Sequence, residues 1–191
     1  IFARNGSFAI SGGSNTTVKS CHITDTQYDA LALSGTGSVV SDNVIMNNGG
    51  IGIQLLGAGN HVSGNIVKGN GDNYAFGQGN QLDLILSEIP ESIDWSASVK
   101  LAGSLESTGN GVVITAGDVT LDLMGFTISG DRGASDFGVY LDGTSSSEIR
   151  NVVLRNGIVR NFGAGVFADN VQDNRFEHLL IATNSNWGII L

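Results

Sequence analysis

The chain has 191 residues, of which 28 are glycine and 41% are hydrophobic, and 9 basic against 18 acidic residues give a net charge of −9. This composition excludes a disordered chain, because the hydrophobic fraction is high and charges are few. The acidic balance argues against binding nucleic acid, which requires a basic surface. No apolar run reaches the roughly 18 residues of a membrane-spanning helix. We expect an extracellular or cell-surface protein.

The region up to residue 73 repeats one pattern with a fixed spacing. The step from Leu31 to Ile53 equals the step from Val40 to Val62. A short fixed period, here about 22 residues, is typical of a solenoid. Within each period, apolar residues alternate and are interrupted by Gly and Asn, which predicts short strands joined by turns. Each coil should rise by one strand separation, ~4.8 Å, so that equivalent residues stack in columns.

Two kinds of column are expected in this region. Phe8, Leu31 and Ile53 should form an apolar column inside the solenoid. Asparagine recurs at turn positions, in Asn43, Asn65 and, in the second half, Asn156, where the side-chain amides can hydrogen-bond along the stack. A structural role in turns is the interpretation that we favour for these asparagines.

The segment 74–98 departs from the pattern and contains Pro90, the sole proline, and Trp95. We therefore expect three parts: coils over 1–73, a connecting or covering segment over 74–98, and a second set of coils over 99–191. Residues 98–105 (SVKLAGSL) are predicted to open the second set as a capping strand.

The second set of coils should have its own internal column, formed by Val112, Val139, Val166 and Ile189. In each strand of the type Gly-apolar-x-apolar, the middle residue then points outward. These outward residues form a continuous apolar stripe, which comprises Val113, Tyr140, Phe167 and Ile190. We call it the contact stripe.

Exposed apolar surface of this extent normally marks a contact. We expect the run 82–93 with Trp95, or another subunit, to cover the stripe. Sugar stacking on Tyr140 and Phe167 is the alternative.

One polar group is a candidate for chemistry. Arg155 and His178 are predicted to share a column on neighbouring coils, with Glu177 one column away. Histidine, arginine and a carboxylate together can transfer protons. The alternative is a solvated row of charges on an outer sheet face. His22 and His61 fall in different columns, so no metal site is predicted.

The stretch DVTLDLMGFTISG (118–130), followed by FGVYL, NVVLRNGIVRNFGAGVFAD and NSNWGIIL, resembles the right-handed parallel β-helix superfamily. That resemblance implies an all-β, right-handed parallel β-helix with coils of about 22 residues. The superfamily includes pectate lyases, which bind calcium through clustered aspartates, and other proteins that hydrolyse or bind polysaccharides. The acidic residues here are scattered singly, so no cofactor is expected, and calcium is the one ion that the resemblance implies.

Two classes of function follow. The first is an extracellular structural module that assembles head-to-tail into a fibre, or that forms one unit of a longer repeat protein. It is favoured because no catalytic constellation is evident and because Trp187–Leu191 opens a coil without finishing it. The second is a polysaccharide lyase, glycoside hydrolase or sugar-binding protein. The sequence favours a protein that is not an enzyme and associates with itself.

Overall fold

The computed structural model describes residues 1–89 and 91–191, which form 24 strands and no helix. They divide into two compact units, Ile1–Ile85 and Leu86–Leu191, which we call unit 1 and unit 2 and describe separately. The boundary at 85/86 falls inside the segment that the sequence suggested as a connection. No helix in the described part of the chain is long and apolar enough to cross a membrane.

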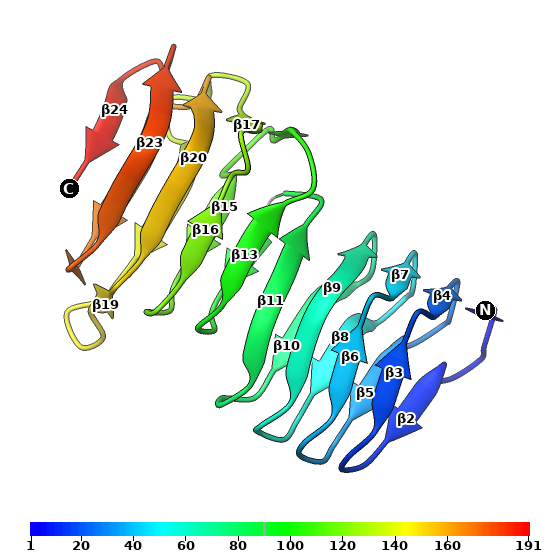
Figure 1. Ribbon diagram of the computed structural model, residues 1–191. Helices are drawn as coiled ribbons and strands as arrows, with labels where there is room; N and C mark the ends of the chain where they lie inside the picture. The colour runs from blue at the N-terminus through cyan, green and yellow to red at the C-terminus, as the bar shows by residue number, and fades with distance from the viewer. Residues whose placement is uncertain (90) are drawn as a thin grey trace. The chain divides into compact units, whose positions relative to one another are not determined.

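Unit 1 is a stack of coils whose strands pair in parallel with those of the next coil (Figure 1). Its strands are β1 (Phe2–Ala3), β2 (Ile10–Gly12), β3 (Thr17–Lys19), β4 (His22–Thr24), β5 (Leu31–Leu33), β6 (Val39–Ser41), β7 (Val44–Met46), β8 (Ile51–Leu55), β9 (His61–Lys68), β10 (Asp72–Phe76) and most of β11 (Gln81–Leu86). One face consists of β2, β5, β8 and β10. A second face consists of β3, β6, the first part of β9, and β11. A third face consists of β1, β4, β7 and the end of β9.

The register confirms the predicted spacing. Leu31 lies opposite Ile53 and Val40 lies opposite Val62. All four side chains are completely buried. The core of unit 1 is therefore a set of apolar columns that only stacking creates, since a single coil has no interior.

The position predicted for Phe8 is wrong. Ile10 lies opposite Leu31, and Phe8 is 46% exposed. The step from Ile10 to Leu31 is one residue shorter than the step from Leu31 to Ile53, so the loop of this coil is shorter than that of the next. Alternation of apolar residues is satisfied equally by Phe8 and by Ile10, and the sequence alone offers no way to detect the shortened loop.

The asparagine columns are confirmed in unit 1, whereas Asn156 of unit 2 donates its amide to Asp122 instead of to another asparagine. Asn43 Nδ2 donates to Asn65 Oδ1, and Asn48 Nδ2 donates to Asn70 Oδ1, both at 2.8 Å. At the corners between strands, residues with positive φ also stack at the same spacing, as Asp42 (57°) and Gly64 (65°) do. Glycine, asparagine and aspartate adopt this left-handed conformation at the lowest cost, which explains their frequency at the turns.

Unit 2 is built in the same way. Its further strands are β12 (Glu91–Ile93), β13 (Ser98–Leu101), β14 (Leu105–Glu106), β15 (Val112–Ile114), β16 (Thr120–Asp122), β17 (Thr127–Ser129), β18 (Phe137–Asp142), β19 (Ile149–Arg150), β20 (Val153–Arg160), β21 (Ala164–Asp169), β22 (Val171–Gln172), β23 (Arg175–Ala182) and β24 (Trp187–Ile190). One sheet has the order β12-β15-β18-β21-β24. Another face consists of β13, β16, β20 and β23. The second half of β20 pairs with β17, which in turn pairs with β14.

The predicted internal column of unit 2 is confirmed: Val112, Val139, Val166 and Ile189 are neighbours in register. The first three are completely buried. Gly138 stands just before Val139, and a Cβ atom there would collide with Val159 Cγ1. Glycine at the start of this strand therefore lets the backbone approach the core closely.

The segment 74–98 also forms coil strands. β10 pairs with β8 and β11 pairs with β9, while β12 pairs with β15. The repeat is hidden in the sequence because the spacing shortens here: Asn60 and Asn80 occupy equivalent turn positions but are only 20 residues apart. A template with a fixed spacing loses register over such a coil.

Candidate functional site

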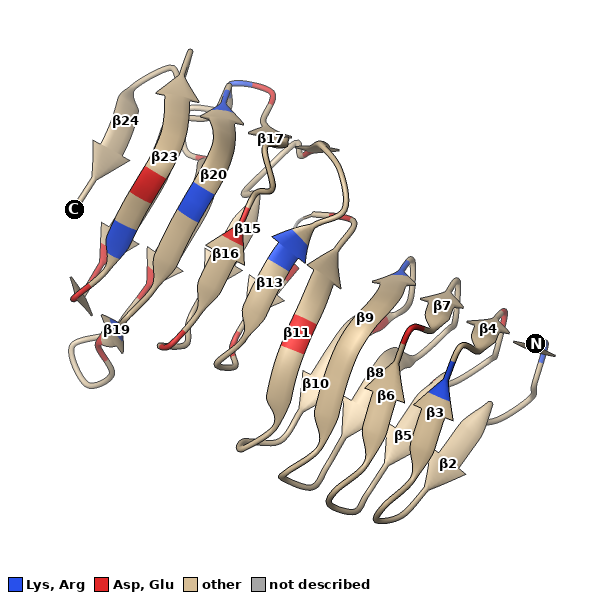
Figure 2. Cartoon of the chain, viewed as in Figure 1, with Lys and Arg blue, Asp and Glu red and all other residues tan. Residues whose placement is uncertain are grey.

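A column of alternating charges crosses the outer face of β13, β16, β20 and β23. Lys100 lies opposite Asp122, and Arg155 lies between Asp122 and Glu177. Figure 2 shows these residues as alternating blue and red bands on neighbouring strands. Arg155 Nε donates to Asp122 Oδ2 at 2.8 Å. Opposite charges placed directly across neighbouring strands stabilise a sheet.

Asp122 is the most enclosed member of this column, with 6% of its surface exposed. Its Oδ1 accepts the Met124 N–H at 2.9 Å and Asn156 Nδ2 at 3.1 Å. Burial alone raises the pKa of Asp122, but the hydrogen bonds from Met124, Asn156 and Arg155 outweigh it and hold the pKa below its usual value. The carboxylate is therefore a charged structural acceptor.

The prediction that Arg155 and His178 share a column is wrong. Arg155 lies opposite Glu177, and His178 is one column further on, opposite Asn156. His178 and Asn156 both have positive φ, 52° and 60°, and mark a corner. The error arose because the inward residue of β20 is Leu154, not Val153, within a run of three apolar residues. A catalytic role for Arg155, His178 and Glu177 stays a prediction.

The contact stripe occupies the outer face of the β12-β15-β18-β21-β24 sheet. Its members pair across neighbouring strands, Val113 with Tyr140, Tyr140 with Phe167, and Phe167 with Ile190, which confirms the shared column. All four side chains are partly exposed, whereas the flanking Val139 and Leu141 are completely buried. The stripe therefore faces away from the core, as alternation along the strands requires.

Three aromatic rings form a compact cluster on the stripe. Phe137 stacks on Phe167 with ring centroids 4.7 Å apart and an interplanar angle of 14°. Tyr140 is tilted against both rings, at 5.1 Å and 5.3 Å. Its hydroxyl donates to Asp142 Oδ1 at 2.7 Å. That hydrogen bond, burial, and the charges of Asp142 and Asp169 raise the pKa of Tyr140 to about 12. Phe137 was missed because its contact depends on how its side chain leans from β18.

The run 82–93 does not cover the stripe as the sequence suggested. Glu91–Ile93 form β12, which extends the stripe's own sheet and places Ser92 opposite Val113. Leu82, Leu84 and Leu86 are buried as the inward residues of β11. The run is apolar because it supplies core residues. Pro90 lies outside the described residues, and a cover supplied by another subunit stays a prediction.

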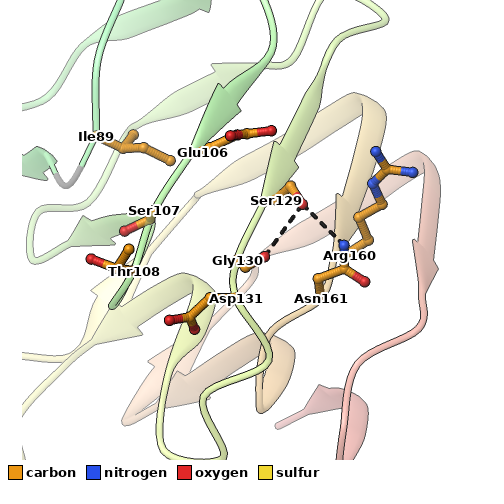
Figure 3. Close-up of a pocket in the computed structure, with 9 residues that line it drawn as sticks. All are labelled: Ile89, Glu106, Ser107, Thr108, Ser129, Gly130, Asp131, Arg160 and Asn161. Carbon is orange, nitrogen blue, oxygen red and sulfur yellow. Dashed lines mark hydrogen bonds between the residues drawn. The ribbon is translucent and has the colours of Figure 1, made fainter.

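A separate cavity of about 510 Å³ lies in unit 2, beyond the ends of β14, β17 and β20 (Figure 3). Its lining residues are Ile89, Glu106, Ser107, Thr108, Ser129, Gly130, Asp131, Arg160 and Asn161. Asn161 Nδ2 donates to Ser129 Oγ at 3.1 Å on one wall. The guanidinium of Arg160 lies across the opening from Glu106 in the close-up. The cavity thus offers charges of both signs and hydroxyl groups, and sequence analysis did not identify it.

Within the ranges 1–89 and 91–191, no group of three or more His, Cys, Asp or Glu side chains is placed to hold a metal ion. Cys21 is a free thiol, and its Sγ contacts the Lys19 carbonyl oxygen at 3.4 Å.

Residues 1–88 match the family model described as a right handed beta helix region. Together with the parallel coils of both units, this match decides the fold. The protein is a right-handed parallel β-helix. Comparison with curated proteins and comparison with solved structures returned no match.

The last coil of this β-helix, formed by β23 and β24, exposes residues that are buried one coil earlier. Val166 is completely buried, but Ile189 in the same column is 41% exposed. Ala164 is 1% exposed, and its neighbour Trp187 is 61% exposed. The apolar columns thus continue to an uncovered face of the described coils.

Two buried amide groups on this last coil have no hydrogen-bond partner among the described residues: Asn174 Nδ2 and Asn184 Nδ2. Their Oδ1 atoms accept the N–H groups of Val152 and Phe162, one coil earlier, at 2.7 Å and 3.0 Å. An unpaired buried amide is costly, so each one needs an explanation.

Proposed function

We propose that this protein is an extracellular structural β-helix module on whose last coil a further coil stacks. The stacking coil comes either from a second copy, in a head-to-tail fibre, or from one longer repeat polypeptide. A function outside the cell is supported by the acidic, glycine-rich composition.

The unpaired amides of Asn174 and Asn184 carry this proposal. Inside unit 1, the equivalent amide of Asn48 donates to the oxygen of Asn70, one coil further on. A coil stacked on β23 and β24 with an oxygen in the same position would satisfy Asn184 in the same way. It would also bury Ile189 and Trp187, and unpaired strand edges with apolar surface favour such addition.

The test is the oligomeric state of the chain, measured by light scattering and electron microscopy over a range of concentrations. We expect filaments in the microscope, or a particle mass that increases with protein concentration. Because Ile189 continues an inward column, Ile189→Lys should abolish the assembly. Leu180→Lys is the matched control, since Leu180 lies on the same coil, is 57% exposed and points outward. A chain that stays monomeric at every concentration would overturn assembly between copies.

A carbohydrate-active or sugar-binding protein is the second candidate, and the cavity of unit 2 is the observation that favours it. Glu106 and Asp131 could accept hydrogen bonds from sugar hydroxyls, and a pair of carboxylates is the usual machinery of glycoside hydrolysis. Arg160 could bind an acidic group.

This candidate is tested by incubating the protein with pectate, alginate and neutral glycans, with and without calcium, and measuring new reducing ends and unsaturated products. Turnover that disappears in Glu106→Gln, but not in Glu148→Gln on a distant exposed turn, would favour it. If the protein neither turns over nor binds any of these glycans, the result would count against this candidate.

A further inference from the structure

We propose that the aromatic cluster of the contact stripe, together with Asp142 and Asp169, is a docking site for a basic partner protein. The partner would present a lysine or arginine side chain set among apolar residues. This inference concerns a side face of the β-helix and does not depend on stacking at its end.

Asp142 and Asp169 bring two negative charges together beside the cluster. They lie opposite each other on β18 and β21, on neighbouring coils. Asp142 is half-buried and Asp169 is exposed, and neither forms an ion pair with any residue that the structure describes. Like charges directly across a sheet destabilise it. A cation bound between them would relieve this repulsion.

Tyr140 holds the first of these carboxylates in place. Its hydroxyl donates to Asp142 Oδ1 at 2.7 Å, which leaves Oδ2 for a ligand. Because an ionised carboxylate can accept several hydrogen bonds, Asp142 can keep Tyr140 and also receive an ammonium or guanidinium group. The carboxylate is thus oriented before any partner binds.

The rings complete the site by accepting the apolar part of a basic side chain. Lysine and arginine pack their methylene stems on apolar surface and keep the charged head in polar surroundings. The rings of Phe137, Tyr140 and Phe167 provide that surface. Tyr140 precedes Asp142 by two positions on β18, and Phe167 stands in the same relation to Asp169 on β21, so ring and carboxylate share a face. Cations are also attracted to aromatic rings.

Charge decides between the possible occupants. The chain carries −9 and two of its carboxylates lie side by side here, so a basic partner is attracted to this face, whereas an anionic membrane is repelled. Val113 and Ile190 extend the apolar surface on either side, for the partner's neighbouring residues. The chemistry therefore favours a basic protein surface over the other occupants.

The test measures binding of a short, capped peptide of alternating leucine and lysine to the full chain, by calorimetry and by nuclear magnetic resonance shifts of Tyr140 and Phe167. We expect binding that weakens with salt. The double variant Asp142→Asn, Asp169→Asn keeps the shape of both side chains and should weaken binding about tenfold or more. A peptide of alternating leucine and glutamine should bind no more tightly than this variant binds the lysine peptide.

The matched control is Asp25→Asn, Asp72→Asn, which removes two exposed charges from unit 1 and should leave binding unchanged. Phe167→Leu should weaken binding while both carboxylates remain. The proposal is overturned if the peptide does not bind, if the control pair weakens binding equally, or if the glutamine peptide binds as tightly. It is also overturned if a neutral oligosaccharide competes with the peptide for the same resonances.

Discussion

Asn43 Nδ2 donates a 2.8 Å hydrogen bond to Asn65 Oδ1, and the two residues are one coil apart. The same oxygen accepts the Asn43 main-chain N–H at 3.0 Å. Asn65 Nδ2 in turn donates to the Val40 carbonyl oxygen at 2.8 Å. A single side chain, 2% exposed, therefore satisfies polar groups on two other segments of the stack.

Replacing Asn65 with alanine should therefore destabilise the protein strongly. The buried Asn43 main-chain N–H would lose its acceptor, and the Asn43 amide would keep only the Val18 carbonyl oxygen. Each unsatisfied donor costs about 1–3 kcal/mol. We expect a loss of about 3 kcal/mol or more in the free energy of unfolding, measured by urea denaturation.

Asn186→Ala is the control for this prediction. Asn186 is exposed, and its one side-chain hydrogen bond among the described residues goes to the Ala134 carbonyl oxygen at 3.0 Å. Its replacement should change stability by about 0.5 kcal/mol or less. Equal effects of the two substitutions would contradict a structural role for the asparagine columns.

The apolar columns give a second prediction that separates the observed register from the one expected from sequence. Ile53 is completely buried, so Ile53→Ala should cost about 2–4 kcal/mol through lost burial and the cavity left behind. Phe8→Ala should cost less than about 1 kcal/mol, because Phe8 is half-exposed outside the column. Similar losses in urea unfolding for the two variants would mean that Phe8 packs in the core after all.

The repeat made most of this fold predictable. Where coils keep the regular spacing, as from Leu31 to Ile53, the expected columns are the observed ones. Prediction failed where a coil shortens, as at Ile10 and at Asn80, because alternation has a period of two and does not reveal a missing loop residue.

The candidate sites were less predictable, because they depend on which member of an apolar run points inward. The sequence analysis took Val153 instead of Leu154 as the inward residue of β20. It therefore placed Arg155 in the column of His178, although Arg155 lies opposite Glu177. By contrast, the glycine before each strand of the stripe fixed its register, and the column through Tyr140 and Phe167 was predicted correctly. The cavity beside Arg160 depends on loop geometry that no repeat encodes.

Asp122 makes stability depend on acid pH. Its pKa in the folded protein lies below the value of about 3.9 that the unfolded chain would have. Its contribution is therefore present above about pH 4 and is lost as the pH falls through the folded pKa. Asp122→Asn should lower the free energy of unfolding at neutral pH. The difference from the unmodified protein, measured by urea unfolding, should become smaller towards about pH 2. A deficit that is independent of pH would show that charge is not what Asp122 contributes.

Tyr140 should titrate at unusually high pH. Its pKa is raised to about 12 because its hydroxyl donates to Asp142 and because the phenolate would form beside two carboxylates. We expect ultraviolet absorbance to reveal a phenol that ionises well above the usual value of about 10. In Asp142→Asn the same phenol should ionise at lower pH, because the hydrogen bond to a charged acceptor and one negative charge are gone.

The sign of the matching stability effect follows from the raised pKa. A group that holds its proton more tightly when folded contributes stability below the unfolded pKa, about 10, and loses it as the pH rises through the folded value, about 12. Tyr140→Phe keeps the ring packed against Phe137 and Phe167 but removes this dependence. The urea midpoint of the unmodified protein should therefore fall more steeply than that of Tyr140→Phe across this interval. Parallel curves for the two proteins would show that the hydroxyl of Tyr140 is not held by Asp142 in solution.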